Sequence, residues 1–378
     1  MAIFQQGFRP FFLGAALFAG IALPLWIAAL ESGLTMPSHF APRDWHIHEM
    51  VFGYFPAVLA GFLLTAIPNW TGRLPVAGPR LAALFALWLA GRGAIAISSV
   101  SPWGAALVDM AFPAALAALA WREVVAGKTL RNVPVCALVT LLAIADAGFD
   151  IAELTARETA PFERLGLGVA AMLIAVIGGR IVPSFTRNWL VKAGRAPLPA
   201  PFGVADKVAI VGLAAALLSW IAVPSSLVTG ALFAIAAALH GARILRWSGW
   251  QTWSEPLVLI LHLGYAWLPI WFALAAVSIL APGSLDASTA LHALTAGAVA
   301  TMTLAVMTRA TLGHTGRALT ANLPTVAIYG LVIAGAALRL FAHALPIDYL
   351  TVLGVAGSLW SAAFILFAIV YGPMLAGR

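Results

Sequence analysis

The stretch VAIVGLAAALLSWIAV, from Val208 to Val223, is rich in Ala and Leu and does not alternate between apolar and polar residues. The stretch LAALFALWLAGRGAIAI, from Leu81 to Ile97, has the same character. A backbone that enters hydrocarbon must satisfy its polar groups within the protein, so membranes are crossed by helices of about 20 apolar residues or by closed barrels of short alternating strands. These long runs therefore predict membrane-spanning helices.

Twelve runs of this kind can be marked along the chain, and they leave no loop long enough for a soluble domain. The composition agrees, because 62% of the 378 residues are hydrophobic, 9% are charged and the mean hydropathy is +0.97. We therefore expect an all-α membrane protein with a single twelve-span transmembrane domain over residues 1–378. The runs cover residues 11–30, 46–67, 80–98, 103–121, 133–150, 164–183, 206–222, 226–243, 254–280, 286–308, 323–343 and 347–371.

The basic residues fall mainly on one side of these runs. Of the 21 Lys and Arg residues, 16 lie on that side, whereas acidic residues such as Glu31, Asp44 and Asp150 belong to the other. Cytoplasmic loops carry an excess of Lys and Arg, so both termini are predicted to be cytoplasmic. The net charge of +7 is spread over many loops rather than massed on one soluble segment, which argues against a nucleic acid partner.

Short motifs recur at the predicted cytoplasmic ends of the second, sixth and tenth runs. Thr71-Gly72-Arg73 recurs as Thr315-Gly316-Arg317 with an offset of 244 residues, and Thr186-Arg187 recurs as Thr308-Arg309 with an offset of 122 residues. The offsets suggest three quasi-repeats of four helices. The alternative is that these residues only anchor helix ends at the membrane interface.

Histidine is the main candidate metal ligand in this chain, which has eight histidines and one cysteine. Because Cys136 is alone, there is no disulfide and no C-x-x-C-H motif, so any haem would be bound without covalent bonds. His46 and His48 open the second run from the outer side, and His292 lies about two turns inside the outer end of the tenth. Three imidazoles at one depth form a candidate metal or haem site.

Helix geometry limits how these side chains share a ligand. His46 and His48 are about 200° apart on a helix, so they face one ligand only if the helix begins between them; otherwise they have separate roles. His46 and Glu49 share a face, and the carboxylate would either ligate a metal or orient an imidazole. The alternative is an interfacial cap without a ligand.

Two further histidines are candidate ligands. His262 lies near the middle of the ninth run, where an ionisable side chain is costly and suggests a function. The alternative for His262 is a neutral ring bonded to a carbonyl of a neighbouring helix. His314 lies in a predicted cytoplasmic loop and is expected to be structural or to face headgroups, unless a second metal site exists there. His240 lies at a run end, where an interfacial role is expected.

Several charged residues lie in or just inside the apolar runs. Asp109, Asp146, Arg92, Arg180 and Arg339 are candidates for ion pairs, proton relays or clamps on haem propionates. The sequence does not show which of them pair. Arg180 and, a little further along, Arg187 are the candidate cofactor-binding arginines.

The motifs of the chain resemble those of the NnrS family of bacterial membrane proteins associated with nitric oxide. They run from the first span to the approach of the eleventh and so cover nearly the whole chain. The matching stretches are GFRPFF at 7–12, WHIHEM at 45–50, GFLLTA at 61–66 with PNWTG at 68–72, GR at 179–180 with PSFTRNW at 183–189, and HALTAG at 292–297 with MTLAVMTR at 302–309 and GHTGR at 313–317.

The resemblance implies a twelve-span protein of the bacterial cytoplasmic (inner) membrane that contains haem and copper and helps cells to withstand nitric oxide. It does not assign the metal ligands. Haem-copper oxidases and related nitric oxide reductases offer a more distant analogy, because they ligate a haem between histidines of their second and tenth spans, as His46 or His48 with His292 would. The histidines of their copper centre have no counterpart here.

We therefore expect a protein of the nitrosative stress response that binds or redox-handles nitric oxide at a histidine-ligated metal. His48 and His292 are the favoured axial ligands of haem b, and His46, Glu49 and His262 are candidates for copper or a second haem. Two other functions stay open: a haem/copper oxidoreductase that reduces nitric oxide with electrons from quinol or another donor, and a secondary transporter for a metal ion or small metabolite. Nitric oxide and membrane lipid are the expected partners.

Overall fold

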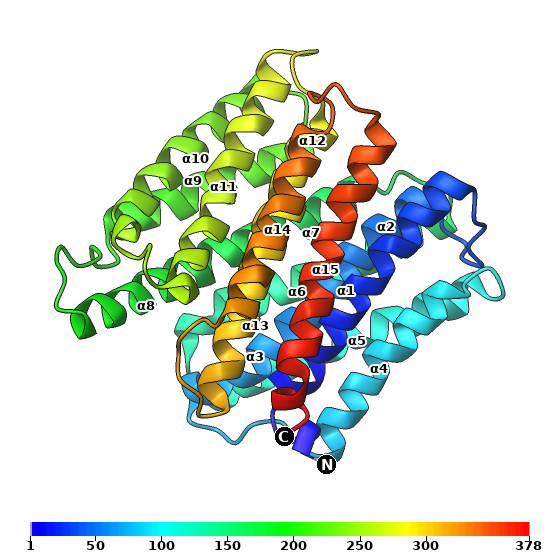
Figure 1. Cartoon of the computed structure of the whole chain (residues 1–378). Coiled ribbons are helices and arrows are strands. Elements are labelled where there is room, and N and C mark those ends of the chain that lie inside the picture. Colours follow the sequence, from blue (N-terminus) through cyan, green and yellow to red (C-terminus); the bar gives the residue numbers. More distant parts are fainter. Residues whose placement is uncertain (1, 378) are drawn as a thin grey trace. The chain divides into compact units, whose positions relative to one another are not determined.

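The structure, a computed structural model, describes residues 2–377, and this part of the chain contains helices and no strands (Figure 1). It forms twelve long helical segments, three of which join two α-helices through a π-helical segment. The segments are α1 (Phe8–Ser32), α2, η2 and α3 (Pro42–His48, Glu49–Tyr54, Phe55–Thr71), α4 (Pro79–Ala96), α5 (Pro102–Ala126), α6 (Val133–Leu154), α7, η4 and α8 (Ala160–Leu173, Ile174–Gly178, Gly179–Lys192), α9 (Val204–Ala222), α10 (Leu227–Leu245), α11 (Pro256–Leu280), α12, η6 and α13 (Ala287–His292, Ala293–Val299, Ala300–His314), α14 (Leu323–Phe341) and α15 (Tyr349–Leu375).

Within residues 2–377, eleven of these segments are long and apolar enough to cross a membrane. The remaining long helix, α4, matches the predicted run at 80–98 but carries Arg80 and Arg92, which lower its hydropathy. Arg92 is buried and paired with carboxylates, so α4 does not expose that charge to lipid. The prediction of an all-α, multi-pass membrane protein is confirmed.

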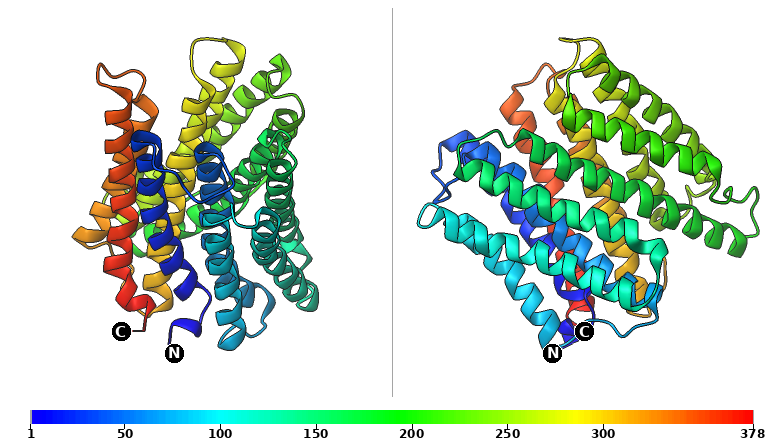
Figure 2. Two further views of the ribbon diagram at one scale, coloured as in Figure 1. Left: turned by 90° about the vertical axis from the view of Figure 1, so that its right-hand side faces the viewer. Right: turned by 180° about the vertical axis from the view of Figure 1, so that it is seen from behind.

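The described chain divides into two compact units. Unit 1 comprises residues 2–169, 310–316 and 364–377, and unit 2 comprises residues 170–309 and 317–363. In unit 1, α1 packs on α3, and α5 packs on both α4 and α6. In unit 2, α10 packs on both α9 and α11, and η6 packs on α11 and α14. Figure 2 shows these helices from two further sides.

A π-helical segment interrupts the second, sixth and tenth long helices. The segment η2 begins directly after His48, and η6 begins directly after His292, so the offset of 244 residues seen in the sequence also relates these two positions. The segment η4 lies between them in the chain. This regular spacing supports the predicted three quasi-repeats of four helices. Such segments occur often at functional sites, which directs attention to His48 and His292.

The start of α1 and the end of α15 lie near each other within unit 1 (Figure 1), and Arg9 joins them. Its Nη1 donates hydrogen bonds to the carbonyl oxygens of Met374 at 3.0 Å and Leu375 at 3.1 Å. The last carbonyls of a helix lack donors from their own helix, so a guanidinium stabilises them. The start of α1 and the end of α15 therefore lie together, as is expected of two chain ends on the same side of a membrane. The cytoplasmic placement of these ends stays a prediction.

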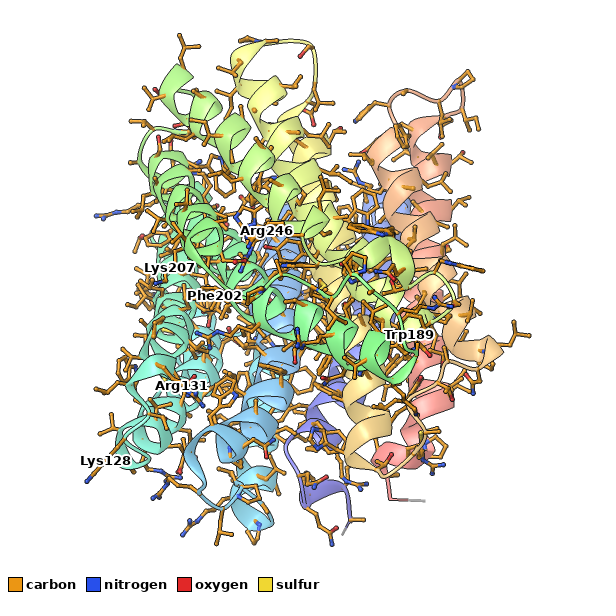
Figure 3. All side chains as sticks on the ribbon, turned by 90° about the vertical axis from the view of Figure 1, so that its left-hand side faces the viewer. Lys128, Arg131, Trp189, Phe202, Lys207 and Arg246 are labelled. Atoms are coloured by element: carbon orange, nitrogen blue, oxygen red, sulfur yellow. The ribbon has the colours of Figure 1, made fainter. Side chains whose placement is uncertain are left out.

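The outward faces of the helices are apolar. Val211, Leu218 and Ile369 lie inside long helices, yet they are 68%, 68% and 66% exposed. Basic side chains lie instead in connections such as that between α5 and α6, where Figure 3 labels Lys128 and Arg131. Apolar outer faces with basic connections are expected of helices surrounded by lipid.

Candidate functional site

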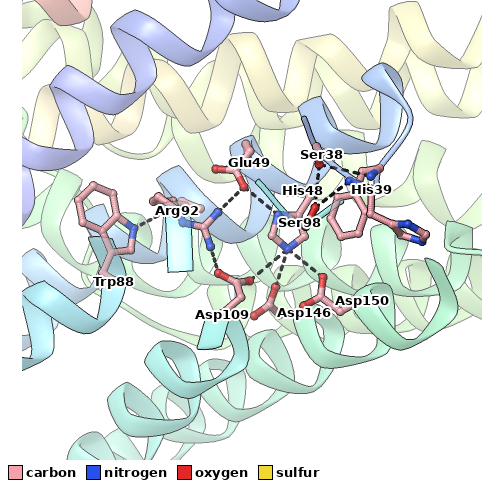
Figure 4. Close-up of polar contacts among 12 residues, drawn as sticks. Ser38, His39, His48, Glu49, Trp88, Arg92, Ser98, Asp109, Asp146 and Asp150 are labelled. Carbon is pink, nitrogen blue, oxygen red and sulfur yellow. Dashed lines mark hydrogen bonds and ion pairs between the residues drawn. The ribbon is translucent and has the colours of Figure 1, made fainter. Parts of the chain in front are cut away.

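A buried cluster of one imidazole and three carboxylates lies in unit 1. His48, the last residue of α2, is 0% exposed. Its Nε2 atom lies 3.1 Å from Asp150 Oδ1, 3.2 Å from Asp109 Oδ2 and 3.4 Å from Asp146 Oδ1 (Figure 4). One ligand atom from each of these four residues lies within 4.8 Å of the others. We call these four residues the His48 cluster.

Two neighbouring helices supply the carboxylates. Asp109 lies on α5, and Asp146 and Asp150 lie on α6, where a spacing of four residues places both side chains on one face. Because α5 packs on α6, this face meets the side chain of Asp109. The cluster therefore follows from the packing of α5 on α6 and from the position of His48 at the start of η2.

Aromatic rings close the surroundings of His48. The ring centroids of Phe40, Phe52 and Phe149 lie 5.1, 5.7 and 5.7 Å from that of the imidazole. All three aromatic side chains are buried. This apolar wall excludes water from the carboxylates, which makes every charge in the His48 cluster more costly and every pairing stronger.

Glu49 and Arg92 form a second layer around the His48 cluster. Glu49 Oε1 lies 3.1 Å from His48 Nδ1 and accepts a hydrogen bond of 2.6 Å from Arg92 Nη1. Arg92 Nη2 also donates to Asp109 Oδ1. An ionised carboxylate only accepts, so His48 Nδ1 carries the proton toward Glu49. Arg92, from α4, thus holds both the residue that orients His48 and one of the three aspartates.

Glycines allow α4 to come this close. A Cβ atom at Gly53 of η2 would clash with Arg92 Nη1, and the Gly53 carbonyl accepts a hydrogen bond of 2.9 Å from Trp88 Nε1. On α4 itself, Gly91 faces Asp109. Side chains at either glycine would push α4 away from η2 or α5, and the contacts of Arg92 depend on this approach.

We expect Gly91→Ala to destabilise the protein. A Cβ atom at Gly91 would lie 2.6 Å from Asp109 Oδ1 and 3.2 Å from Asp109 Cα, and overpacking of this kind costs about 1–3 kcal/mol. Gly93→Ala is the matched control on the same helix, because nothing lies within 4 Å of a Cβ atom there and alanine favours helix by about 1 kcal/mol. Thermal unfolding in detergent measures both. A Gly91→Ala protein that is as stable as the Gly93→Ala protein would contradict the close approach.

The buried charges around His48 do not balance. Four carboxylates, of Glu49, Asp109, Asp146 and Asp150, face one guanidinium, and all these side chains are almost fully buried. Both carboxylate oxygens of Asp146 and of Asp150 lack a hydrogen-bond donor. The distances to His48 Nε2 are within ion-pair reach, but one N–H points at one acceptor only and does not satisfy three carboxylates. The site therefore requires added positive charge, either protons or a cation.

His46 points away from the His48 cluster. Its ring stacks on Trp26 of α1, with centroids 4.0 Å apart and planes inclined by 19°. The two histidines therefore have separate surroundings, which is the second of the two predicted arrangements, because α2 begins at Pro42 and not between them. Glu49 orients an imidazole as expected, but the imidazole is that of His48. The prediction considered residues three apart on a regular helix and missed this pair, because Glu49 directly follows His48 where α2 passes into the π-helical segment η2.

His292, in unit 2, presents one ring nitrogen with a lone pair. Its Nδ1 lies 2.7 Å from the carbonyl oxygen of Ser288, and because a carbonyl only accepts, Nδ1 carries the proton and Nε2 does not. Ser288 Oγ also accepts from Arg339 Nη2 at 3.5 Å, and Arg339 Nη1 is buried without a hydrogen-bond partner. Because His48 belongs to unit 1, the predicted pairing of His48 with His292 on one iron stays a prediction.

His262 is buried in α11 and bonded to a neighbouring helix. Its Nε2 lies 2.7 Å from Thr186 Oγ1, which donates its own hydrogen to the Val182 carbonyl at 2.8 Å, so Nε2 carries the ring proton. Nδ1 has no hydrogen-bond partner and faces Gly249, where a Cβ atom would lie 2.5 Å away. The alternative predicted for His262 was a ring bonded to a carbonyl of a neighbouring helix. The ring is indeed bonded to a neighbouring helix, but the partner is the hydroxyl of Thr186.

The remaining candidate ligands lie at exposed positions. His314 is the last residue of α13 rather than part of a loop, and its ring lies 5.5 Å from that of Phe8. Arg180 and Arg187 are both exposed on α8. Their predicted roles, a second metal site and propionate binding, stay predictions.

The expectation for His240 is wrong, because its side chain is fully buried rather than interfacial. Its Nε2 donates to the Ala209 carbonyl at 3.1 Å, and its Nδ1 accepts from Tyr265 Oη at 2.8 Å. Tyr265 Oη in turn accepts from Arg243 Nη1 at 2.8 Å, and Arg243 Nε donates to Asp206 Oδ1 at 2.8 Å. Both ring nitrogens of His240 are thus used by the protein in this network of unit 2.

The sequence did not assemble the His48 cluster. The sequence predicts Asp109, Asp146 and Arg92 as charges in or just inside apolar runs. It places Asp150 at the end of its run, among the acidic residues of the outer side, whereas the structure shows it 0% exposed on α6. One signal was available. Asp146 and Asp150 are four residues apart in an apolar helix, so they share a face, and a repeated carboxylate on one face of a membrane helix indicates a partner of opposite charge.

A comparison with protein families gives one match over almost the entire chain. The model described as "NnrS protein" matches residues 2–378. No curated protein matches the chain.

Proposed function

Because the chain belongs to the NnrS family, we propose that it is a haem- and copper-binding protein of the bacterial cytoplasmic membrane that binds or redox-handles nitric oxide. In this proposal it serves the response to nitrosative stress, and a histidine-ligated metal receives the gas. Nitric oxide reaches the metal through the surrounding lipid, and quinol or another donor supplies electrons. The family supports the biological role, and the contacts of individual histidines support the site.

The observation that carries the haem proposal is the state of His292. Its Nδ1–H is held by the Ser288 carbonyl, which leaves the Nε2 lone pair for iron. Arg339 donates to the Ser288 side chain, and its Nη1 has no hydrogen-bond partner. A buried guanidinium of this kind fits a haem propionate. His292 would therefore bind the iron and Arg339 would neutralise a propionate. Bound haem would supply reversible nitric oxide binding and one-electron chemistry.

His48 fits haem and copper poorly in this arrangement. Its Nε2 faces three carboxylate oxygens and its Nδ1 faces Glu49, so the flat face of a porphyrin would have to displace three aspartates. Copper in proteins prefers imidazole and sulfur ligands, whereas the His48 cluster offers one imidazole and three carboxylates. The haem proposal therefore rests on His292. His46 and His262 stay candidates for copper, whereas Glu49 contacts His48 and Arg92, and His314 stays a candidate ligand only of a second metal site.

We expect His292→Ala to remove most of the haem from the purified protein. The Soret absorbance per chain should fall at least about tenfold, because an axial ligand is lost. His343→Ala is the matched control, since His343 is also in unit 2 but is exposed and stacked on Tyr349. Nitric oxide should shift the Soret band of wild type and of His343→Ala. Full haem content in His292→Ala would refute the assignment of this ligand.

A secondary transporter is the second candidate, because the His48 cluster places unbalanced carboxylates inside a membrane protein. Buried ionisable groups of this kind line proton and cation pathways. A colourless, haem-free preparation that moves a metal ion or protons across proteoliposomes would favour it. Steady nitrous oxide formation with a quinol would instead establish catalytic reduction of nitric oxide.

A further inference from the structure

We propose that His48, Asp109, Asp146 and Asp150 bind one divalent, non-haem transition-metal ion of the iron(II), manganese(II) or zinc(II) class. The site is separate from the haem and copper of the proposed function, and it would exist whether or not haem binds. It combines a nitrogen and three carboxylate ligands from three helical segments of unit 1 (Figure 4).

The spacing of the ligand atoms fits a single ion. Ligands at about 2.1 Å from one metal lie about 3.0 Å apart at adjacent octahedral positions and about 3.4 Å apart at tetrahedral positions. The three separations between His48 Nε2 and the aspartate oxygens are 3.1, 3.2 and 3.4 Å. Carboxylates that only repelled one another would spread further apart, so the convergence of their oxygens indicates a shared cation.

The charge of the site calls for more than one positive charge. With His48 neutral, the carboxylates of Glu49, Asp109, Asp146 and Asp150 outnumber the guanidinium of Arg92 by three. Each buried ion in excess costs several kcal/mol. A divalent ion removes two of these three charges at once and supplies a partner to the carboxylate oxygens of Asp146 and Asp150, which otherwise lack one.

Glu49 prepares His48 for this role. Glu49 Oε1 accepts a hydrogen bond from Nδ1–H of His48. In a neutral His48 the lone pair is then on Nε2, which points into the cluster. A carboxylate that fixes the tautomer of a ligating imidazole is a common feature of metal sites. Arg92 holds Glu49 and Asp109 together, so contacts within the protein position His48 and one of the three aspartates.

The ligand set selects the class of metal. Three carboxylate oxygens and one imidazole suit iron(II), manganese(II) and zinc(II), whereas copper(I) prefers sulfur. Magnesium and calcium usually bind oxygen ligands alone. The competing arrangement holds protons instead of a metal: His48 is then an imidazolium, and the excess carboxylates are protonated.

Metal analysis of the purified, full-length protein separates these arrangements. The protein is purified without chelator, dialysed against manganese(II), iron(II) or zinc(II), freed of unbound ion, and analysed for metal, haem and protein in the same sample. Wild type should hold about one divalent ion per chain beyond haem iron and copper. In the double variant Asp146→Asn/Asp150→Asn, the content of this ion per chain should fall at least about tenfold, and the haem content should stay the same. Glu158→Gln, an exposed carboxylate of the same unit, should behave as wild type.

Two results would overturn the metal site. One is a wild-type protein that, after dialysis against each of the three ions, retains no more divalent metal than the double variant. The other is a folded double variant with full metal content. Should the double variant fail to fold, wild type treated with chelator gives the answer, because loss of a bound ion should lower its Tm by about 5 °C and re-addition should restore it. An unchanged Tm with no ion released would contradict the proposal.

The same samples keep this proposal apart from the haem proposal. Loss of haem in His292→Ala with the divalent ion retained would leave the His48 cluster intact as a metal site. Loss of the divalent ion in the double variant with the Soret band retained would show that haem binds independently of the His48 cluster. Haem-free wild type that still binds one divalent ion would support the His48 cluster alone.

Discussion

Arg92→Ala should lower the free energy of unfolding by about 3–5 kcal/mol, the usual cost of removing one partner from a buried ion pair. Arg92 contacts two of the carboxylates around His48, through Glu49 Oε1 at 2.6 Å and through Asp109 Oδ1. Without it, all the buried carboxylates of the site repel one another in surroundings closed to water. We expect low folded yield in detergent and a markedly lower Tm.

Arg43→Ala is the matched control for Arg92. Arg43 also belongs to unit 1 and also contacts two carboxylates, Asp44 at 2.7 Å and Glu163 at 3.3 Å, but its side chain is 67% exposed. Exposed pairs contribute about 0–1 kcal/mol, so this variant should unfold close to wild type. Equal stability of the Arg92→Ala and Arg43→Ala proteins would show that protons or a bound cation, rather than Arg92, neutralise the buried carboxylates.

Arg243→Ala should have a comparable effect in unit 2, again about 3–5 kcal/mol. The Arg243 side chain is 1% exposed and donates to Asp206 Oδ1, to the Ala175 carbonyl and to Tyr265 Oη, each at 2.8 Å. Its loss leaves the Asp206 carboxylate and the Ala175 carbonyl without these donors and removes the charge that pairs with Asp206. Tyr265 would keep only its bond to His240 in this network. Thermal unfolding of the purified protein measures the effect.

Arg246→Ala tests the same carboxylate from the solvent side. Arg246 Nη1 lies 3.3 Å from Asp206 Oδ2, and its side chain is 34% exposed. Because Arg243 remains paired with Asp206 in this variant, we expect a loss of no more than about 1 kcal/mol. A larger loss in Arg246→Ala than in Arg243→Ala would mean that the network of Arg243, Tyr265 and His240 contributes little to the stability of unit 2.

Every segment that crosses hydrocarbon must be apolar and must satisfy its own backbone polar groups, whatever its neighbours are. This is why the helices predicted from local hydropathy match the structure. The run predicted at 133–150 became α6 (Val133–Leu154), and the run at 323–343 became α14 (Leu323–Phe341). The largest difference concerned polar residues near helix ends. The predicted run ends at Asp150, yet α6 continues to Leu154, and the Asp150 carboxylate lies in the buried His48 cluster. Local hydropathy does not report such partners.

Helix geometry left two arrangements for His46 and His48, one ligand shared by both rings or separate roles, and the structure decided between them. Because α2 begins at Pro42 rather than between the two histidines, their rings lie about 200° apart and diverge. That His46 meets Trp26 and His48 meets three aspartates depends on which helices lie on each side of α2 and η2. The same holds for His240, whose buried network requires α9, α10 and α11 to pack together.

By itself the sequence determined that this chain is an all-helical membrane protein, roughly where its helices run, and which family its motifs resemble, because the cost of exposing backbone polar groups to lipid acts on each segment independently. Only the tertiary structure decided which buried charges meet. His48, Asp109 and the pair Asp146 and Asp150 come from three separate helical segments, and no local property of one segment specifies the partners of another. Because these carboxylates are buried away from water, they need added positive charge where they converge. The proposed metal site rests on that need.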